Sequence, residues 1–80
     1  MDINEIKEKT KVFLVEEMEI DPETIVPQAR LKEDMHIDSL EVVDIAVFVE
    51  NTFGYKIKPE DFKGLETFEQ FCQFIQKNIG

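Results

Sequence analysis

Eighty residues, 42% of them hydrophobic, suffice for one small core, and we expect a single domain over residues 1–80. A chain of this size leaves too little buried volume to enclose a multi-residue active site, which argues against a stand-alone enzyme. Eighteen acidic and nine basic residues give a net charge of −9, which repels nucleic acid and anionic membranes and attracts basic proteins.

Cysteine content and the N-terminal sequence bear on localisation. The lone cysteine, Cys72, excludes an internal disulfide and a multi-cysteine metal site, and we expect no metal. No basic stretch followed by an apolar run opens the chain, so we expect no signal peptide. The longest apolar run, Ile45 to Val49, is far shorter than the roughly 20 residues of a membrane span. We therefore expect a cytoplasmic monomer that binds neither membrane nor nucleic acid.

The first predicted element is a helix from Ile3 to about Glu17–Glu19. Asp2 and Glu5 have the spacing of a capping box at its start. Its apolar face follows the helical period and comprises Ile3, Ile6, Thr10, Phe13 and Leu14.

No helical period holds over residues 20–37, where Pro22 and Pro27 interrupt any long helix. We predict a long loop that contains one turn at Asp21–Pro22. Its isolated apolar anchors are Ile25, Leu31, Met35 and Ile37. A loop of this length in a small domain usually has a function.

A second helix is predicted from Ser39 to Thr52 or Phe53. Asp38 is its N-cap, Glu41 completes a capping box, and Gly54 supplies a left-handed C-terminal residue.

The remainder is a linker over residues 55–58, a short helical turn from Pro59 to Phe62 or Lys63 that Gly64 stops, and a last helix. Thr67 and Gln70 cap the last helix. Its apolar face comprises Phe68, Phe71, Cys72, Ile75 and Ile79. The fold class is therefore all-α: a small four-helix bundle of three main helices and one short helix, with a long loop between the first and second helices.

The second predicted helix has apolar residues on two opposite sides. One side can enter the core and comprises Val42, Ile45, Ala46, Val49 and Phe53. The other comprises Leu40, Val43 and Val47, which lie among carboxylates, and no lysine or arginine occurs between Lys32 and Lys56. Isolated exposed apolar side chains are common, but three on one edge favour a docking surface for a basic partner.

Ser39 occupies the first position of this helix. A hydroxyl there is exposed, and a phosphate esterified to it would lie beside the free N–H groups of the first turn, where helix ends favour anions. Asp and Ser at helix starts usually serve only as caps, so the pair is a weak motif without its context.

Asp38-Ser39-Leu40, followed by Glu41-Val42-Val43-Asp44-Ile45, resembles the phosphopantetheine attachment region of acyl carrier proteins, and the resemblance covers nearly the whole chain. It implies a four-helix bundle whose Ser39, within the Asp38–Leu40 motif, carries 4′-phosphopantetheine transferred from coenzyme A by a phosphopantetheinyl transferase. The chain would then carry acyl intermediates as thioesters without catalysing their reactions. Its partners would be acyl-transferring and ketosynthase-type enzymes with basic docking surfaces.

The resemblance also implies roles for two sets of residues. The partner-recognition set is Leu40, Glu41, Val43, Asp44, Val47 and Glu50. The set for the core and acyl pocket is Val42, Ile45, Ala46, Val49, Phe53, Ile57, Phe62, Leu65 and Phe71.

The chain departs from the family pattern at three positions. His36 stands where the family usually has glycine, which adopts a positive φ more easily, so the last turn of the loop is expected to differ. Phe62 and Phe71 stand where carriers of fatty acid synthesis often have smaller side chains, and we expect these rings to fill space in which a long acyl chain would lie. Fatty acid, polyketide and related pathways all stay open.

Other interpretations explain the sequence less well. His36, Asp38 and Ser39 are too close in sequence for a catalytic triad. A calcium-binding loop starting at Asp34 fails because Ser39 and Ile45 replace its required glycine and glutamate. Cys72 lies on an apolar stripe, typical of a buried thiol. The main alternative is an unmodified acidic adaptor or inhibitor module that binds a basic protein.

Overall fold

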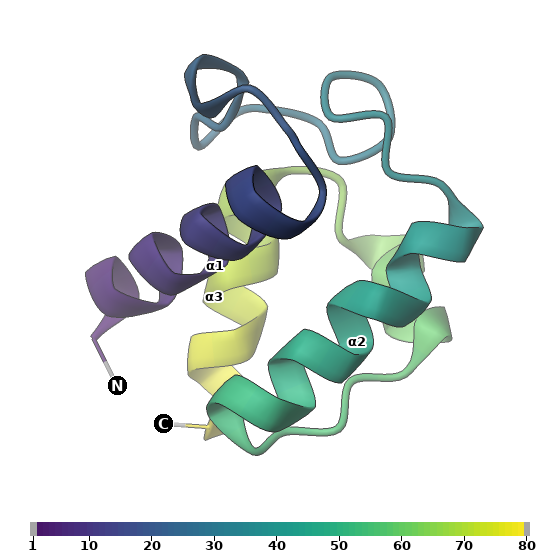
Figure 1. Ribbon diagram of the computed structural model, residues 1–80. Coiled ribbons are helices and arrows are strands. Elements are labelled where there is room, and N and C mark those ends of the chain that lie inside the picture. Colours follow the sequence, from purple (N-terminus) through teal and green to yellow (C-terminus); the bar gives the residue numbers. More distant parts are fainter. Residues whose placement is uncertain (1, 80) are drawn as a thin grey trace.

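The computed structural model describes residues 2–79 and consists of helices joined by ordered loops (Figure 1). Three α-helices, α1 (Ile3–Glu17), α2 (Ser39–Phe53) and α3 (Phe68–Ile79), alternate with two short 3₁₀ helices, η1 (Pro22–Thr24) and η2 (Pro59–Gly64). Over these described residues the only β pairing is an isolated bridge between Arg30 and Thr67. The all-α fold class is confirmed.

Helices α1 and α3 pack against each other through their apolar faces (Figure 1). Ile6, Thr10 and Leu14 of α1 are buried, at the three- and four-residue spacing that places them on one side of a helix. The predicted capping box at its start is wrong, because the Asp2 side chain makes no capping hydrogen bond. Only the Asp2 carbonyl contributes there, accepting from Ile6 N at 3.1 Å.

The long loop between α1 and α2 is anchored on the start of α3. Phe68 N donates a hydrogen bond to Ala29 O of the loop at 2.9 Å, and Leu31 N of the loop donates one to Glu66 O at 2.9 Å. The four predicted apolar anchors are all buried, and Ala29 is buried with them. These contacts order a segment that has little helix of its own, and it covers the upper end of the bundle in Figure 1.

Helix α2 buries Ile45 and Val49 and contacts η2, which lies behind it in Figure 1. The linker between them has no strand and buries Ile57. Helix α3 begins with the predicted capping box: Gln70 N donates to Thr67 Oγ1 and Thr67 N to Gln70 Oε1, both at 3.2 Å.

Aromatic contacts join α1 to α2 and η2 to α3, and Phe48 is the one ring among them that no predicted apolar face or core set included. The Phe48 ring of α2 stacks on Phe13 of α1 with centroids 4.2 Å apart and meets Phe53 edge-on at 5.7 Å. Phe62 of η2 stacks on Phe71 of α3 at 5.9 Å. The Phe13–Phe48 and Phe62–Phe71 pairs each fix the packing of two elements, whereas Phe48 and Phe53 both belong to α2.

Across residues 2–79, none of the helices is both long enough and apolar enough to cross a bilayer.

Candidate functional site

The start of α2 is fixed by Asp38. Its carboxylate Oδ1 accepts from Leu40 N at 3.0 Å and from Glu41 N at 3.2 Å, and its carbonyl accepts from Val42 N at 3.1 Å. The predicted N-cap is confirmed. The second bond of a capping box, from Asp38 N to the Glu41 carboxylate, is not formed among the described residues.

Ser39 is the first residue of α2 and is exposed. Its hydroxyl makes no hydrogen bond to any residue that the structure describes, so the oxygen is accessible from solvent and unengaged. The expectation that the first-turn N–H groups stay free for a phosphate is wrong for Leu40 and Glu41, because Asp38 occupies both donors. An anion at Ser39 would therefore not find these two donors free.

The loop enters α2 through a left-handed turn at His36, which has a φ of 58°. The side chain is exposed, whereas its neighbours Met35 and Ile37 are buried and hold the turn in place. The turn thus has the left-handed backbone conformation that glycine adopts easily, although the residue is a histidine. The expected difference in this turn is therefore not seen in the φ of His36.

The outward side of α2 is apolar and acidic, as its sequence predicted. Leu40, Val43 and Val47 are 80%, 55% and 51% exposed. Asp44 and Glu50 are exposed beside them, and Glu41 is half-buried. This surface has the chemistry of a contact area that a partner protein would cover.

A groove of about 290 Å³ lies where the loop, α2 and η2 meet. Its apolar floor is formed by Leu31, Ile37, Val42, Phe62 and Leu65. Val42 lies three residues after Ser39, so the groove and the hydroxyl share one side of α2.

The residues expected to form a core and acyl pocket do not form one cavity. Ile45, Val49, Ile57 and Phe71 are buried in the core, whereas Ala46 and Phe53 are half-buried. Val42, Phe62 and Leu65 line the groove instead. The interior void beside Phe71 measures only about 10 Å³, so the core is essentially filled.

Sequence reasoning missed the cationic part of the groove, which comprises Arg30, Lys32 and Lys63. These residues come from the loop and from η2, about thirty positions apart, and no local spacing connects them. The sequence held one indication of these cations: Leu31 was expected to be buried, and Arg30 and Lys32 on either side of it would then lie at the nearby surface.

The chain is similar over most of its length to known carrier proteins. Residues 9–75 match the family model described as the phosphopantetheine attachment site. The chain is 34% identical over 79 residues to an acyl carrier protein of Thermosynechococcus vestitus, covering 99% of this chain and 98% of that protein. It is 37% identical over 72 residues to acyl carrier protein 2 of Ralstonia nicotianae, covering 90% and 89%. It is also similar to the meromycolate extension acyl carrier protein of Mycobacterium leprae, at 43% identity over 58 residues, 72% of this chain and 50% of that one.

These matches and the helical fold define a phosphopantetheine-binding carrier domain. More narrowly, the chain belongs to the acyl carrier protein family.

The prosthetic group of this family is 4′-phosphopantetheine, and the residues at the start of α2 fit it. A phosphodiester needs an exposed hydroxyl with no competing hydrogen bond, and Ser39 supplies one. When bound, the group supplies a thiol that holds acyl groups as thioesters.

Proposed function

We propose that Ser39 carries the 4′-phosphopantetheine arm and that the chain presents acyl thioesters to successive enzymes of fatty acid, polyketide or related biosynthesis. The observation that carries this proposal is the exposed, unbonded Ser39 hydroxyl at the first position of α2. Asp38 holds that position by capping Leu40 N and Glu41 N, so the helix start does not depend on the serine. Ser39 is thereby free for modification.

The chain's own role is to hold and present its cargo, not to catalyse. Asp38 orients the first turn of α2, so the attachment point projects into solvent from a rigid element. A phosphopantetheinyl transferase would transfer the arm from coenzyme A, forming the phosphodiester at Ser39 Oγ. We infer a cytoplasmic, monomeric carrier formed as a single domain by residues 1–80.

We infer that partners dock on the outward side of α2, through Leu40, Val43 and Val47 surrounded by Glu41, Asp44 and Glu50. The exposed apolar side chains offer area to bury, and the carboxylates attract basic enzyme surfaces at long range. Both a transferase and ketosynthase-type enzymes would use this surface in turn. The similarity to a meromycolate extension acyl carrier protein supports a role in acyl-group biosynthesis.

Intact mass tests the attachment. Incubated with coenzyme A and a broad-specificity phosphopantetheinyl transferase, the wild type should gain one phosphopantetheine unit, and Ser39→Ala should gain none. The fold of Ser39→Ala should be unchanged, because Asp38 still caps α2. If the wild type stays unmodified with several transferases, the acidic adaptor or inhibitor module that binds a basic protein becomes the better assignment.

Association kinetics test the docking surface. Glu41→Lys or Asp44→Lys should slow binding to the transferase about tenfold at low salt, with a smaller effect as salt screens the charges. Glu5→Lys is the matched control, because Glu5 is exposed in the first turn of α1, which lies on the opposite side of the molecule from the start of α2 (Figure 1). Equal slowing by Glu5→Lys would show that net charge, and not the α2 surface, governs association.

A further inference from the structure

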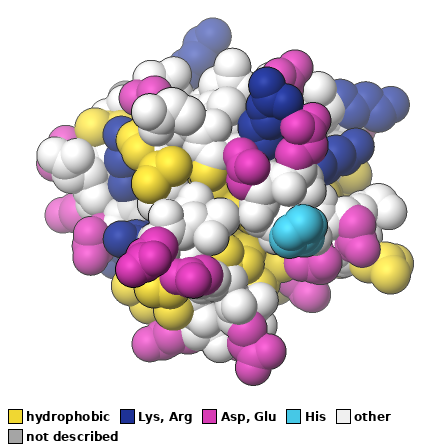
Figure 2. Space-filling view, turned by 90° about the horizontal axis from the view of Figure 1, so that it is seen from above, with side chains coloured by type: hydrophobic (Ala, Val, Ile, Leu, Met, Phe, Trp, Pro, Cys, Tyr) yellow, Lys and Arg dark blue, Asp and Glu magenta, His cyan; other side chains and the backbone are white. Residues whose placement is uncertain are grey.

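The groove beside α2 brings an apolar floor together with several cations. Arg30, Lys32 and Lys63 line it together with Glu33 and Glu66, which gives the lining a net charge of +1 in a chain of −9. The loop end of the molecule shows Lys and Arg side chains in small groups beside Asp and Glu, not in one basic patch (Figure 2). The cations of the groove are therefore a local feature.

Two of these cations are available to a ligand. Arg30 is engaged, since its Nη1 lies 2.7 Å from Glu33 Oε2. Lys32 and Lys63 are exposed and form no ion pair within residues 2–79. Two unpaired ammonium groups at one groove attract an anionic group that reaches it.

The floor of the groove limits the length of an alkyl chain that can bind there. Val42 and Leu65 are half-buried and offer apolar contacts at the surface of the groove, whereas Leu31 is buried. Phe62, which also lines the groove, stacks on the buried Phe71 at 5.9 Å, and the void beside Phe71 is about 10 Å³. A long alkyl chain therefore has no space to continue inward, whereas a short group can lie along the floor.

We propose that the groove binds a short acyl group that ends in a carboxylate, with its methylenes on the apolar floor and the carboxylate at Lys32 and Lys63. This proposal rests on the proposed function, because the acyl group reaches the groove from an arm on Ser39. Val42 lies one helical turn from Ser39, so a flexible tether at the hydroxyl can return to the groove. An alkyl group of equal length would touch the floor but leave both lysines solvated.

NMR of loaded protein tests the proposal with a matched pair of four-carbon groups. Amide-linked succinyl and butanoyl pantetheine analogues, which cannot hydrolyse, are loaded onto Ser39, and loading is verified by mass. Occupancy of the groove is read from the methyl shifts of Val42 and Leu65 and their NOEs to acyl methylenes. We expect occupancy about threefold to tenfold higher for succinyl than for butanoyl at low salt, as for two exposed ion pairs.

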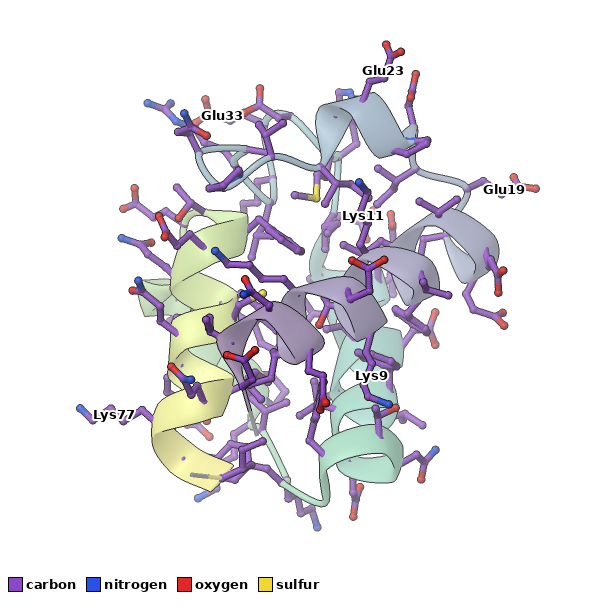
Figure 3. All side chains as sticks on the ribbon, turned by 90° about the vertical axis from the view of Figure 1, so that its left-hand side faces the viewer. Lys9, Lys11, Glu19, Glu23, Glu33 and Lys77 are labelled. Carbon is purple, nitrogen blue, oxygen red and sulfur yellow. The ribbon has the colours of Figure 1, made fainter. Side chains whose placement is uncertain are left out.

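Lys32→Gln/Lys63→Gln should abolish the difference between the two groups. Lys77→Gln is the matched control, since Lys77 of α3 points away from the bundle at its opposite end (Figure 3) and should leave the difference intact. All three substituted lysines are exposed, so these variants should fold like the wild type.

The remaining outcomes separate this inference from the proposed function. No mass gain at Ser39 would overturn the proposed function itself. Normal loading with equal methyl shifts for succinyl and butanoyl would overturn only the inference. The inference would also be overturned if the bare thiol arm, with no acyl group, gave methyl shifts as large as the succinyl arm and these shifts also required Lys32 and Lys63. The phosphate of the arm would then be the bound anion.

Discussion

At the scale of single residues, His36 shows a conformation that its side chain disfavours. Its φ of 58° lies in the left-handed region, where a residue with a Cβ is strained and glycine is not. His36→Gly should therefore raise the free energy of unfolding by about 0.5–1 kcal/mol, the relief of strain less the added chain entropy of glycine. Urea unfolding measures the change as a higher midpoint.

Two further positions provide controls for this prediction. Glu19 also has a positive φ, 54°, so Glu19→Gly should stabilise to a similar extent. Gln28 is an exposed loop residue outside the left-handed region, and Gln28→Gly should destabilise. If His36→Gly destabilised as much as Gln28→Gly, strain at His36 would be the wrong explanation.

Cys72 makes stability depend on pH. Burial raises the pKa of its thiol from 9.0 to about 12, against opposing effects of Lys7 and Thr10. Above pH 9.0 the unfolded chain loses this proton while the folded chain keeps it, so the free energy of unfolding falls as the pH rises. The expected slope from this group is about 1.4 kcal/mol per pH unit.

Cys72→Ala isolates that contribution from other groups that titrate in alkali. The difference in unfolding free energy between wild type and variant should be constant below pH 9.0 and decline above it, up to about pH 12. Urea titrations over this range measure it. A constant difference at every pH would mean that the thiol has the same pKa in both states.

At the scale of elements, Asp2 and Asp38 occupy equivalent N-cap positions but behave differently. Asp38 caps two N–H groups of α2, whereas the Asp2 side chain caps none in α1. Asp38→Ala should lower the unfolding free energy by about 1 kcal/mol and Asp2→Ala by almost nothing. Chemical unfolding of both variants tests this, and equal losses would show that the carboxylates act through the helix dipole and not through their hydrogen bonds.

Helix boundaries and faces were predictable because each rests on local chemistry. Asp38 and Gly54 fix the ends of α2, with Gly54 in the left-handed conformation at a φ of 75°. The exposed and buried sides of α2 followed from a 100° turn per residue. The missing cap at Asp2 was not predictable, because sequence spacing does not determine whether the carboxylate accepts a hydrogen bond from the backbone N–H groups of the first turn.

At the scale of the whole molecule, contacts between distant segments were beyond local reasoning. The stack of Phe48 on Phe13 and the backbone bonds from the loop to the start of α3 join residues far apart in sequence. The proposed attachment motif, Asp38–Leu40, was identifiable because it is contiguous. The groove and its cations were not, because they exist only once η2 and the loop have packed beside α2.

The filled core leads to a prediction about long acyl chains. Phe62 and Phe71 close the inner end of the groove, so an octanoyl chain on the wild type should stay in solvent and leave the unfolding free energy unchanged. Phe62→Ala removes the outer ring and should let the chain enter. Octanoylation should then stabilise that variant by about 0.8 kcal/mol for each methylene it buries.

Comparison of each protein with a bare thiol arm and with an octanoyl arm measures this gain, and NMR shifts near Ile37 and Phe71 locate the chain. Phe74→Ala is the matched control, because Phe74 meets Tyr55 edge-on at 6.0 Å, away from the groove, so its loss removes an aromatic pair without opening the inner end. Octanoylation should leave that variant as stable as its bare-thiol form. An octanoyl chain already protected inside the wild-type bundle, with shifts beside Phe62 and Phe71, would show that the two rings move aside and do not limit chain length.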